Sequence, residues 1–139
     1  NHLRYYYMLQ RDYFLRLIEE FMAAVSKFLE KDEAQRHDDD MRDLYREYVG
    51  PYDIVRNLSF DELIAYSKDN WRPQERMDRI HFMAELLYAE ASYKANPLRD
   101  LLLGKAYQIY SYLDANSGVM SLDRRQKMEE ISSLTRQND

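Results

Sequence analysis

His81 and Glu85 are the two side chains whose spacing best suits chemistry. They lie four residues apart in a segment with helical periodicity, so both side chains reach one face of a helix. An imidazole and a carboxylate on one face can ligate a metal ion, but a zinc site needs at least a third protein ligand. We therefore predict no metal site here and interpret His81 as a partly exposed histidine beside a helical carboxylate.

A second polar group is the run from His37 to Asp40, in which three aspartates follow a histidine. Carboxylates attract hard cations, but this run lacks the glycine and the terminal glutamate of a calcium-binding loop. Acidic side chains also suit the positive end of a helix dipole. We interpret the run as the solvated start of a helix.

Motifs for nucleophilic or phosphate chemistry are missing from the sequence. Gly50, Gly104 and Gly118 are too far apart to form a phosphate loop, and neither G-x-S-x-G nor H-E-x-x-H occurs. The chain has no cysteine, which excludes thiolate chemistry. We expect no catalytic residue and no cofactor. The alternative is an enzyme or small-ligand binder whose interhelical pocket uses His81, Glu85 and nearby tyrosines.

Helices must position these residues, because the composition disfavours a sheet protein. The 139 residues include only three glycines and three prolines, which favours long helices joined by short turns. We predict one all-α domain over residues 1–139, an antiparallel helical array of about five or six helices. Residues 1–7 precede Met8 and are expected to be an extension or a remnant foreign to the domain.

Apolar side chains at three- and four-residue steps predict where the helices lie. The first expected helix spans residues 10–31, and the others span 39–49, 59–68, 73–95, 97–116 and 121–136. The clearest start signal is Ser59 with Glu62, which form a capping box. Asn96 and Pro97 suit the cap and the first turn of a helix, so we predict an antiparallel hairpin with almost no loop.

Small residues interrupt the apolar faces of residues 73–136 and allow helices to approach closely; they are Ala84, Ala91, Gly104 and Ala106. Leu103 and Gly104, followed by Tyr107, are similar to the first-helix signature of a tetratricopeptide repeat (TPR). Residues 73–136 thus resemble a TPR-like hairpin. The resemblance implies a right-handed TPR-like superhelix.

The chain as a whole resembles a family of small bacterial TPR-like proteins without assigned function. The resemblance is carried by the run from Met8 to Tyr13 and by the Leu-Arg-Leu-Ile-Glu-Glu run from Leu15 to Glu20. It implies a helical fold and a bacterial cytoplasmic setting. It implies no catalytic residues.

Charge and hydropathy exclude two classes of partner. The net charge of −5 gives no general attraction to phosphate backbones, so we expect no nucleic acid. No apolar run approaches the roughly 18–20 residues that span a bilayer. The polar face of the first helix mixes both charges, so we expect no membrane partner. The lack of cysteine fits a reducing, cytoplasmic compartment.

Thirteen tyrosines point toward a protein partner, because tyrosine combines apolar area with a hydroxyl and is common at interfaces. We expect a non-catalytic, TPR-like interaction module with a groove beside the hairpin. The first helix carries more apolar surface than one neighbour covers, so we also expect a homodimer through this helix. The expected interaction surface comprises Phe21, Phe28, Tyr52, Tyr66, Trp71 and Tyr112.

Overall fold

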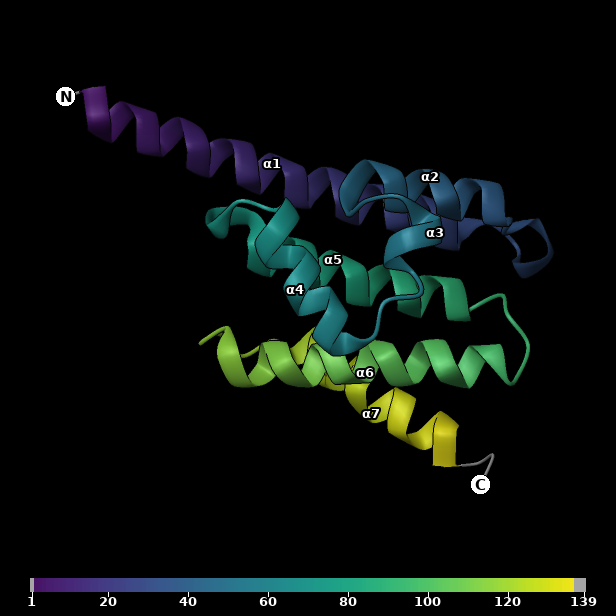
Figure 1. Cartoon of the computed structure of the whole chain (residues 1–139). Helices are drawn as coiled ribbons and strands as arrows, with labels where there is room; N and C mark the ends of the chain where they lie inside the picture. Colours follow the sequence, from purple (N-terminus) through teal and green to yellow (C-terminus); the bar gives the residue numbers. More distant parts are fainter. Residues whose placement is uncertain (1, 137–139) are drawn as a thin grey trace.

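The protein is an array of helices in the computed structural model, which describes residues 2–136 (Figure 1). A short 3-10 helix (Glu33–Gln35) separates the first two of seven α-helices: α1 (His2–Glu30), α2 (Asp38–Tyr48), α3 (Tyr52–Val55), α4 (Phe60–Asn70), α5 (Pro73–Ala91), α6 (Leu98–Asn116) and α7 (Leu122–Arg136). No strand occurs in this range, which confirms the all-α prediction. The helix count exceeds the predicted one because α3 is a single turn without a periodic apolar pattern.

Local signals define several helix ends where the sequence predicted them. The Ser59 hydroxyl accepts a hydrogen bond from the Glu62 amide, and the Glu62 carboxylate accepts one from the Ser59 amide, at 3.2 and 2.9 Å. Gly50 follows α2 with a φ of +147°, and a Cβ there would lie 2.6 Å from the Tyr66 hydroxyl. The chain can therefore turn after α2 only because residue 50 is glycine.

Two predicted boundaries were wrong. The helix α1 begins at His2 rather than at residue 10, and residue 1 lies outside the described range. That residues 1–7 are an extension or a remnant stays a prediction. The helix α5 ends at Ala91 rather than residue 95, and residues 92–97 form a loop before α6. The backbone tightens there, because the amides of Ser92, Tyr93 and Lys94 each bond the carbonyl three residues earlier.

The helix α5 lies at the centre of the array and contacts α1, α2, α4 and α6. It runs antiparallel to α6, as predicted, and α7 packs on α6 (Figure 1). One hydrophobic cluster draws buried side chains from all seven α-helices. At its middle the Phe21 ring of α1 stacks on the Phe82 ring of α5, with centroids 4.0 Å apart. This packing places every other element around α5.

The small residues of α5 and α6 do not all serve close packing. Ala84, Ala91 and Ala106 are buried in the core. Gly104 is exposed, and a Cβ built there would meet no atom within 4 Å. The expectation that Gly104 allows a neighbouring helix to approach is therefore wrong.

Candidate functional site

Two of the six predicted interface residues lie in the core of the chain itself. Phe21 is 0% and Phe28 is 4% exposed. Phe21 stacks on Phe82, and the Phe28 ring meets Tyr93 edge to face at 5.8 Å. The prediction that Phe21 and Phe28 face a partner is wrong, because α2 and α5 already cover this face of α1.

The other four predicted residues are half-buried at separate places. Tyr66 and Trp71 meet edge to face across the turn between α4 and α5, with ring centroids 5.6 Å apart. Tyr112 of α6 packs edge to face on Phe60 of α4 at 5.3 Å. Tyr52 points inward to a buried carboxylate. The structure does not gather these side chains into one surface.

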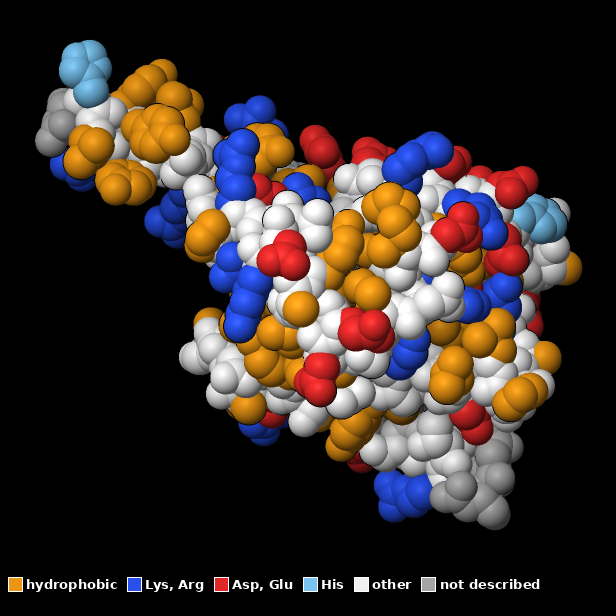
Figure 2. Space-filling model, in the orientation of Figure 1, with side chains coloured by type: hydrophobic (Ala, Val, Ile, Leu, Met, Phe, Trp, Pro, Cys, Tyr) orange, Lys and Arg blue, Asp and Glu red, His pale blue; other side chains and the backbone are white. Residues whose placement is uncertain are grey.

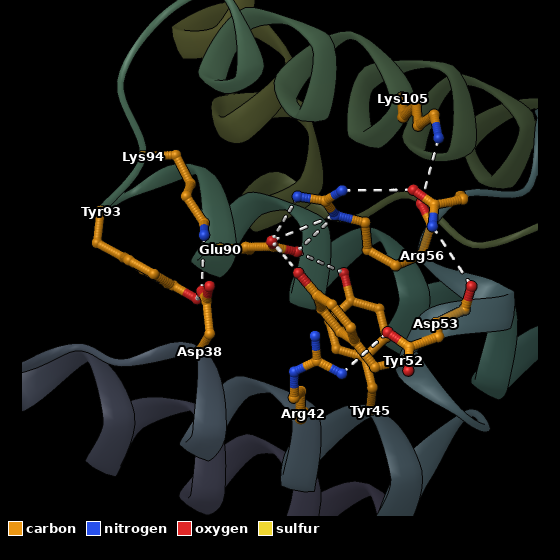
Figure 3. Close-up of polar contacts among 11 residues, drawn as sticks. Asp38, Arg42, Tyr45, Tyr52, Asp53, Arg56, Glu90, Tyr93, Lys94 and Lys105 are labelled. Carbon is orange, nitrogen blue, oxygen red and sulfur yellow. Dashed lines mark hydrogen bonds and ion pairs between the residues drawn. The ribbon is translucent and has the colours of Figure 1, made fainter.

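Glu90, on α5, is that carboxylate and is wholly buried (Figure 3). Its Oε2 accepts hydrogen bonds from the Tyr52 hydroxyl at 2.6 Å and from Nη2 of Arg56 at 2.9 Å. Its Oε1 accepts one from the Tyr45 hydroxyl at 3.2 Å. Burial, followed by the interactions with Glu90, raises the pKa of both tyrosines, so both are neutral donors at ordinary pH.

Further polar contacts surround this cluster (Figure 3). Arg42 pairs with Asp53 at 2.9 Å and lies over the Tyr52 ring, 4.7 Å from its centroid. Lys105 of α6 donates a hydrogen bond to the Arg56 carbonyl at 3.2 Å. Both oxygens of Glu90 already accept protein hydrogen bonds, and the cluster ties α5 to α2, α3 and α6.

Glu85 forms the second buried cluster of α5. Its Oε1 lies 3.1 Å from Nε2 of His81, so the predicted shared helix face is confirmed. Its Oε2 accepts a hydrogen bond from Nζ of Lys127, on α7, at 2.5 Å. Burial alone would raise the pKa of Glu85, but His81 and Lys127 together hold that pKa below its ordinary value. Lys127 occupies the side of the carboxylate that a bound cation would need.

Glu75, near the start of α5, is the third buried carboxylate of this helix. Its Oε1 accepts a hydrogen bond from Nε of Arg79 at 2.6 Å, and Arg79 also donates to the carbonyl of Tyr48. No group of three or more His, Asp or Glu side chains within residues 2–136 is arranged to hold a metal ion. The three glutamates are thus engaged by basic side chains of the chain itself.

The N-terminal half of α1 projects beyond the bundle, and hydrophobic side chains gather on it (Figures 1 and 2). We call residues 2–16 the arm. Nine of the large hydrophobic side chains of α1 are exposed, and all but Met22 lie in the arm: Leu3, Tyr5, Tyr6, Tyr7, Met8, Leu9, Tyr13, Leu15 and Met22. Exposed apolar side chains gathered in this way are typical of surfaces that bind another molecule.

One line of side chains runs the length of α1 and joins the arm to the core. These side chains follow one another at alternating steps of four and three residues, the spacing of a coiled-coil seam. We call this line the seam; it consists of Leu3, Tyr7, Gln10, Phe14, Leu17, Phe21, Ala24 and Phe28. The C-terminal part of the seam is covered by α5. At the other end Leu3 and Tyr7 are each 62% exposed. The seam therefore continues past the helix that covers it.

A hollow of about 580 Å³ lies where α5 begins, beside the arm. Its walls are five arm residues and three residues around the first turns of α5: Tyr6, Leu9, Gln10, Tyr13, Phe14, Arg72, Glu75 and Arg79. The hollow beside the hairpin, between α4 and α6, holds only about 10 Å³. The groove is thus at the arm rather than beside the hairpin, where the sequence suggested it.

No protein-family model, curated protein or solved structure matches the chain. Within residues 2–136, every helix is too short or too polar to cross a bilayer.

Proposed function

We propose that this protein is a non-catalytic interaction module that binds a helix of another chain along its arm. The observation that carries the proposal is the seam of α1, which α5 covers at one end and which is exposed at Leu3 and Tyr7 at the other. A helix-in-groove partner supplies apolar side chains at the same three- and four-residue spacing. Such a partner would continue the packing that α5 begins.

The chemistry of the arm supports a protein partner. Tyr6, Tyr7 and Tyr13 are more than half exposed, and tyrosine is enriched at interface cores because it loses little conformational entropy. Gln10 is the one amide on the seam, and its Nε2 already donates to the Tyr6 hydroxyl at 2.8 Å. We expect the tyrosines to supply most of the binding free energy.

We further propose that α5, α6 and α7 are arranged in the manner of a TPR-like array. The support is the succession of antiparallel α5 and α6 with α7 on α6, and the burial of Ala84, Ala91 and Ala106 between them. The alternative, an interhelical small-ligand site at His81, has no such support, because Nε2 of His81 is already engaged by Glu85.

The test of the proposed function is photo-crosslinking from the arm. A photoreactive phenylalanine replaces Tyr7 on the seam or, as the matched control, Tyr5, which is 65% exposed on another face of the same helix. Each variant is irradiated in a soluble extract of the cells that make the protein. We expect one discrete protein adduct from position 7, and a much weaker one from position 5. Equal adducts from both positions, or none from position 7, would contradict the proposal.

A further inference from the structure

We infer that the chain bound along the arm is a second copy of this protein, whose own arm lies antiparallel on the first. This inference rests on the proposed function and names its partner. Two observations lead to it: the seam is complementary to itself, and the second arm would continue an interface that the fold already contains.

The seam residues of the arm are symmetric in their spacing. Leu3, Tyr7, Gln10 and Phe14 follow one another at steps of four, three and four residues. Reversing the direction of the helix reproduces the same steps. In an antiparallel pair related by a two-fold axis, Leu3 lies opposite Phe14 of the second copy, and Tyr7 lies opposite Gln10. Each apolar end therefore meets an apolar end, and each polar position meets a polar one.

The central pairing gives the dimer a defined register. Nε2 of Gln10 donates a hydrogen bond to the Tyr6 hydroxyl of its own chain, at 2.8 Å. The side-chain oxygen of Gln10, Oε1, can therefore accept a hydrogen bond from the Tyr7 hydroxyl of the second copy. This pair occurs twice, once on each side of the axis. A shift by one heptad toward the two bundles would place Gln10 opposite Phe14 of the second copy, and a polar seam residue opposite an apolar one destabilises that register.

The second arm also continues the interface between α1 and α5. The seam is covered from Phe28 back to the region of Phe14, where the hollow beside the start of α5 begins. An antiparallel arm fills this hollow with its own first turns and leaves the two bundles at opposite ends of the pair. A parallel arm would bring both bundles onto the same face of the seam, where they would overlap.

The exposed area is adequate for a weak dimer. Tyr6, Tyr7 and Tyr13 are 55%, 62% and 57% exposed, and aromatic side chains can bury about 150–250 Å² each. With Leu3, two copies supply on the order of 1,000 Å², the lower end of specific interfaces.

The charge of the arm differs in sign from that of the rest of the chain. The arm carries three arginines against one aspartate, a net charge of +2 with histidine neutral, while the whole chain carries −5. The remainder therefore carries −7, which gives a long-range attraction between the arm of one copy and the bundle of another. The two arms themselves carry the same charge, so charge affects how often two copies meet and does not determine the pairing of the arms. Arg4 of one copy comes near Arg11 of the other at the rim, where both side chains reach solvent.

The first experiment compares Tyr7→Glu with Tyr5→Glu by sedimentation equilibrium of the purified chain over about 1–300 µM, a range suited to an interface of this size. Both tyrosines are more than 60% exposed, so both variants should fold, which circular dichroism checks. We expect a monomer–dimer equilibrium that Tyr7→Glu weakens at least about 30-fold, the effect of losing a central interface aromatic. Tyr5→Glu should weaken it by less than about threefold.

The second experiment tests the direction of the pair, using the absence of native cysteine. Tyr7→Cys and Gln10→Cys variants are mixed and oxidised in air. The antiparallel register predicts that the mixed disulfide between positions 7 and 10 forms faster than either symmetric one, because these Cβ atoms face each other. Faster formation of the symmetric disulfide at position 7 would overturn the antiparallel pair.

The outcomes separate this inference from the proposed function. A purified chain that stays monomeric throughout, while position 7 still crosslinks to a different protein, overturns the second copy and leaves the interaction module standing. A monomer that gives no protein adduct and instead sediments with phosphatidylserine vesicles overturns both. A crosslinked adduct with twice the mass of the chain supports both.

Discussion

Glu90 shows at the level of a single residue why the buried polar groups of this chain are structural. Its carboxylate has no exposure, and Arg56 is its only cationic partner among the contacts described above. The Arg56→Met variant would leave that charge buried with only two tyrosine hydroxyls. We expect it to lower the free energy of unfolding by about 3–5 kcal/mol, measured by urea denaturation.

The matched control is the pair of Arg42 with Asp53, whose side chains are 47% and 78% exposed. Solvent screens this pair, so Arg42→Ala should leave the free energy of unfolding almost unchanged. Equal costs for the two variants would mean that the Glu90 cluster contributes no more than a surface pair.

Glu85 gives a dependence of stability on pH. Its pKa in the folded chain lies below the ordinary 4.5, because His81 and Lys127 outweigh the effect of burial. The charged Glu85 therefore contributes its full stabilisation of the folded chain above about pH 4.5. This contribution is lost as the pH falls through the lowered pKa that Glu85 has in the folded chain.

We expect Glu85→Gln to remove part of the loss of stability in acid, as measured by urea unfolding at pH values on both sides of 4.5. Some loss of stability in acid should remain in this variant, because the pKa of Asp38 is also lowered, by its contacts with Lys94 and Tyr93. A variant with the same acid profile as the parent chain would contradict the role of Glu85.

The sequence predicted only the local part of these clusters. The spacing of His81 and Glu85 indicated a shared helix face, and the structure confirms their contact. Lys127 could not be assigned, because its approach to Glu85 depends on how α7 folds back on α6. Glu90 was missed because a glutamate on a long helix is usually solvated; the only available signal was its place between Ala89 and Ala91, both buried.

At the level of elements, a capping box and a glycine marked helix ends that the sequence predicted well, whereas Asn96 and Pro97 indicated a helix start directly after the preceding helix and missed the loop of residues 92–97. The capping box is that of Ser59 and Glu62, and the glycine is at position 50. The end of α5 has no such marker and arises from a change in backbone hydrogen bonding. For α1, the periodicity was read only from residue 10 onward, so the predicted helix was too short.

Gly104 provides a test at the same scale. It lies within α6, is exposed, and has open space where a Cβ would go. Gly104→Ala should therefore raise the free energy of unfolding by about 0.5–1 kcal/mol, because alanine has the higher helix propensity. Thermal and urea denaturation measure this change.

The contrasting control is Gly50→Ala. The positive φ and the 2.6 Å distance from the new Cβ to the Tyr66 hydroxyl should make it clearly destabilising. A destabilised Gly104→Ala variant would instead indicate the close helix contact that TPR-like arrays have at such a position.

At the level of the whole molecule, Phe21 distinguishes the core from the proposed interface. Phe21 is covered by Phe82 and Tyr48 of its own chain. Phe21→Ala should lower the free energy of unfolding by about 3–5 kcal/mol. Urea unfolding should show the same decrease at low and at high protein concentration. A cost that grows with concentration would place Phe21 in a dimer contact after all.

The sequence could predict that α1 has too much apolar surface, but not where the excess lies. Periodicity treats every seam residue alike, whereas coverage depends on where α5 begins. Since α5 starts at Pro73 and lies beside Phe14 rather than Leu3, the exposed part is the arm. The residues Phe21 and Phe28, which look most apolar, are for that reason the ones that the fold covers.

The three buried glutamates of α5 have one more consequence: they fix the position of α5 along the axis of this helix. Glu75, Glu85 and Glu90 are separated by ten and five residues, or about 15 and 7.5 Å at 1.5 Å per residue. Leucine and alanine contacts would tolerate a slide of one turn, about 5.4 Å. The same slide would part Glu85 from Lys127 and Glu90 from Arg56. It would also part Arg79, which Glu75 holds within α5, from the carbonyl of Tyr48. The carboxylates thus set the axial position of the central helix, and with it the distance by which α1 overhangs the bundle.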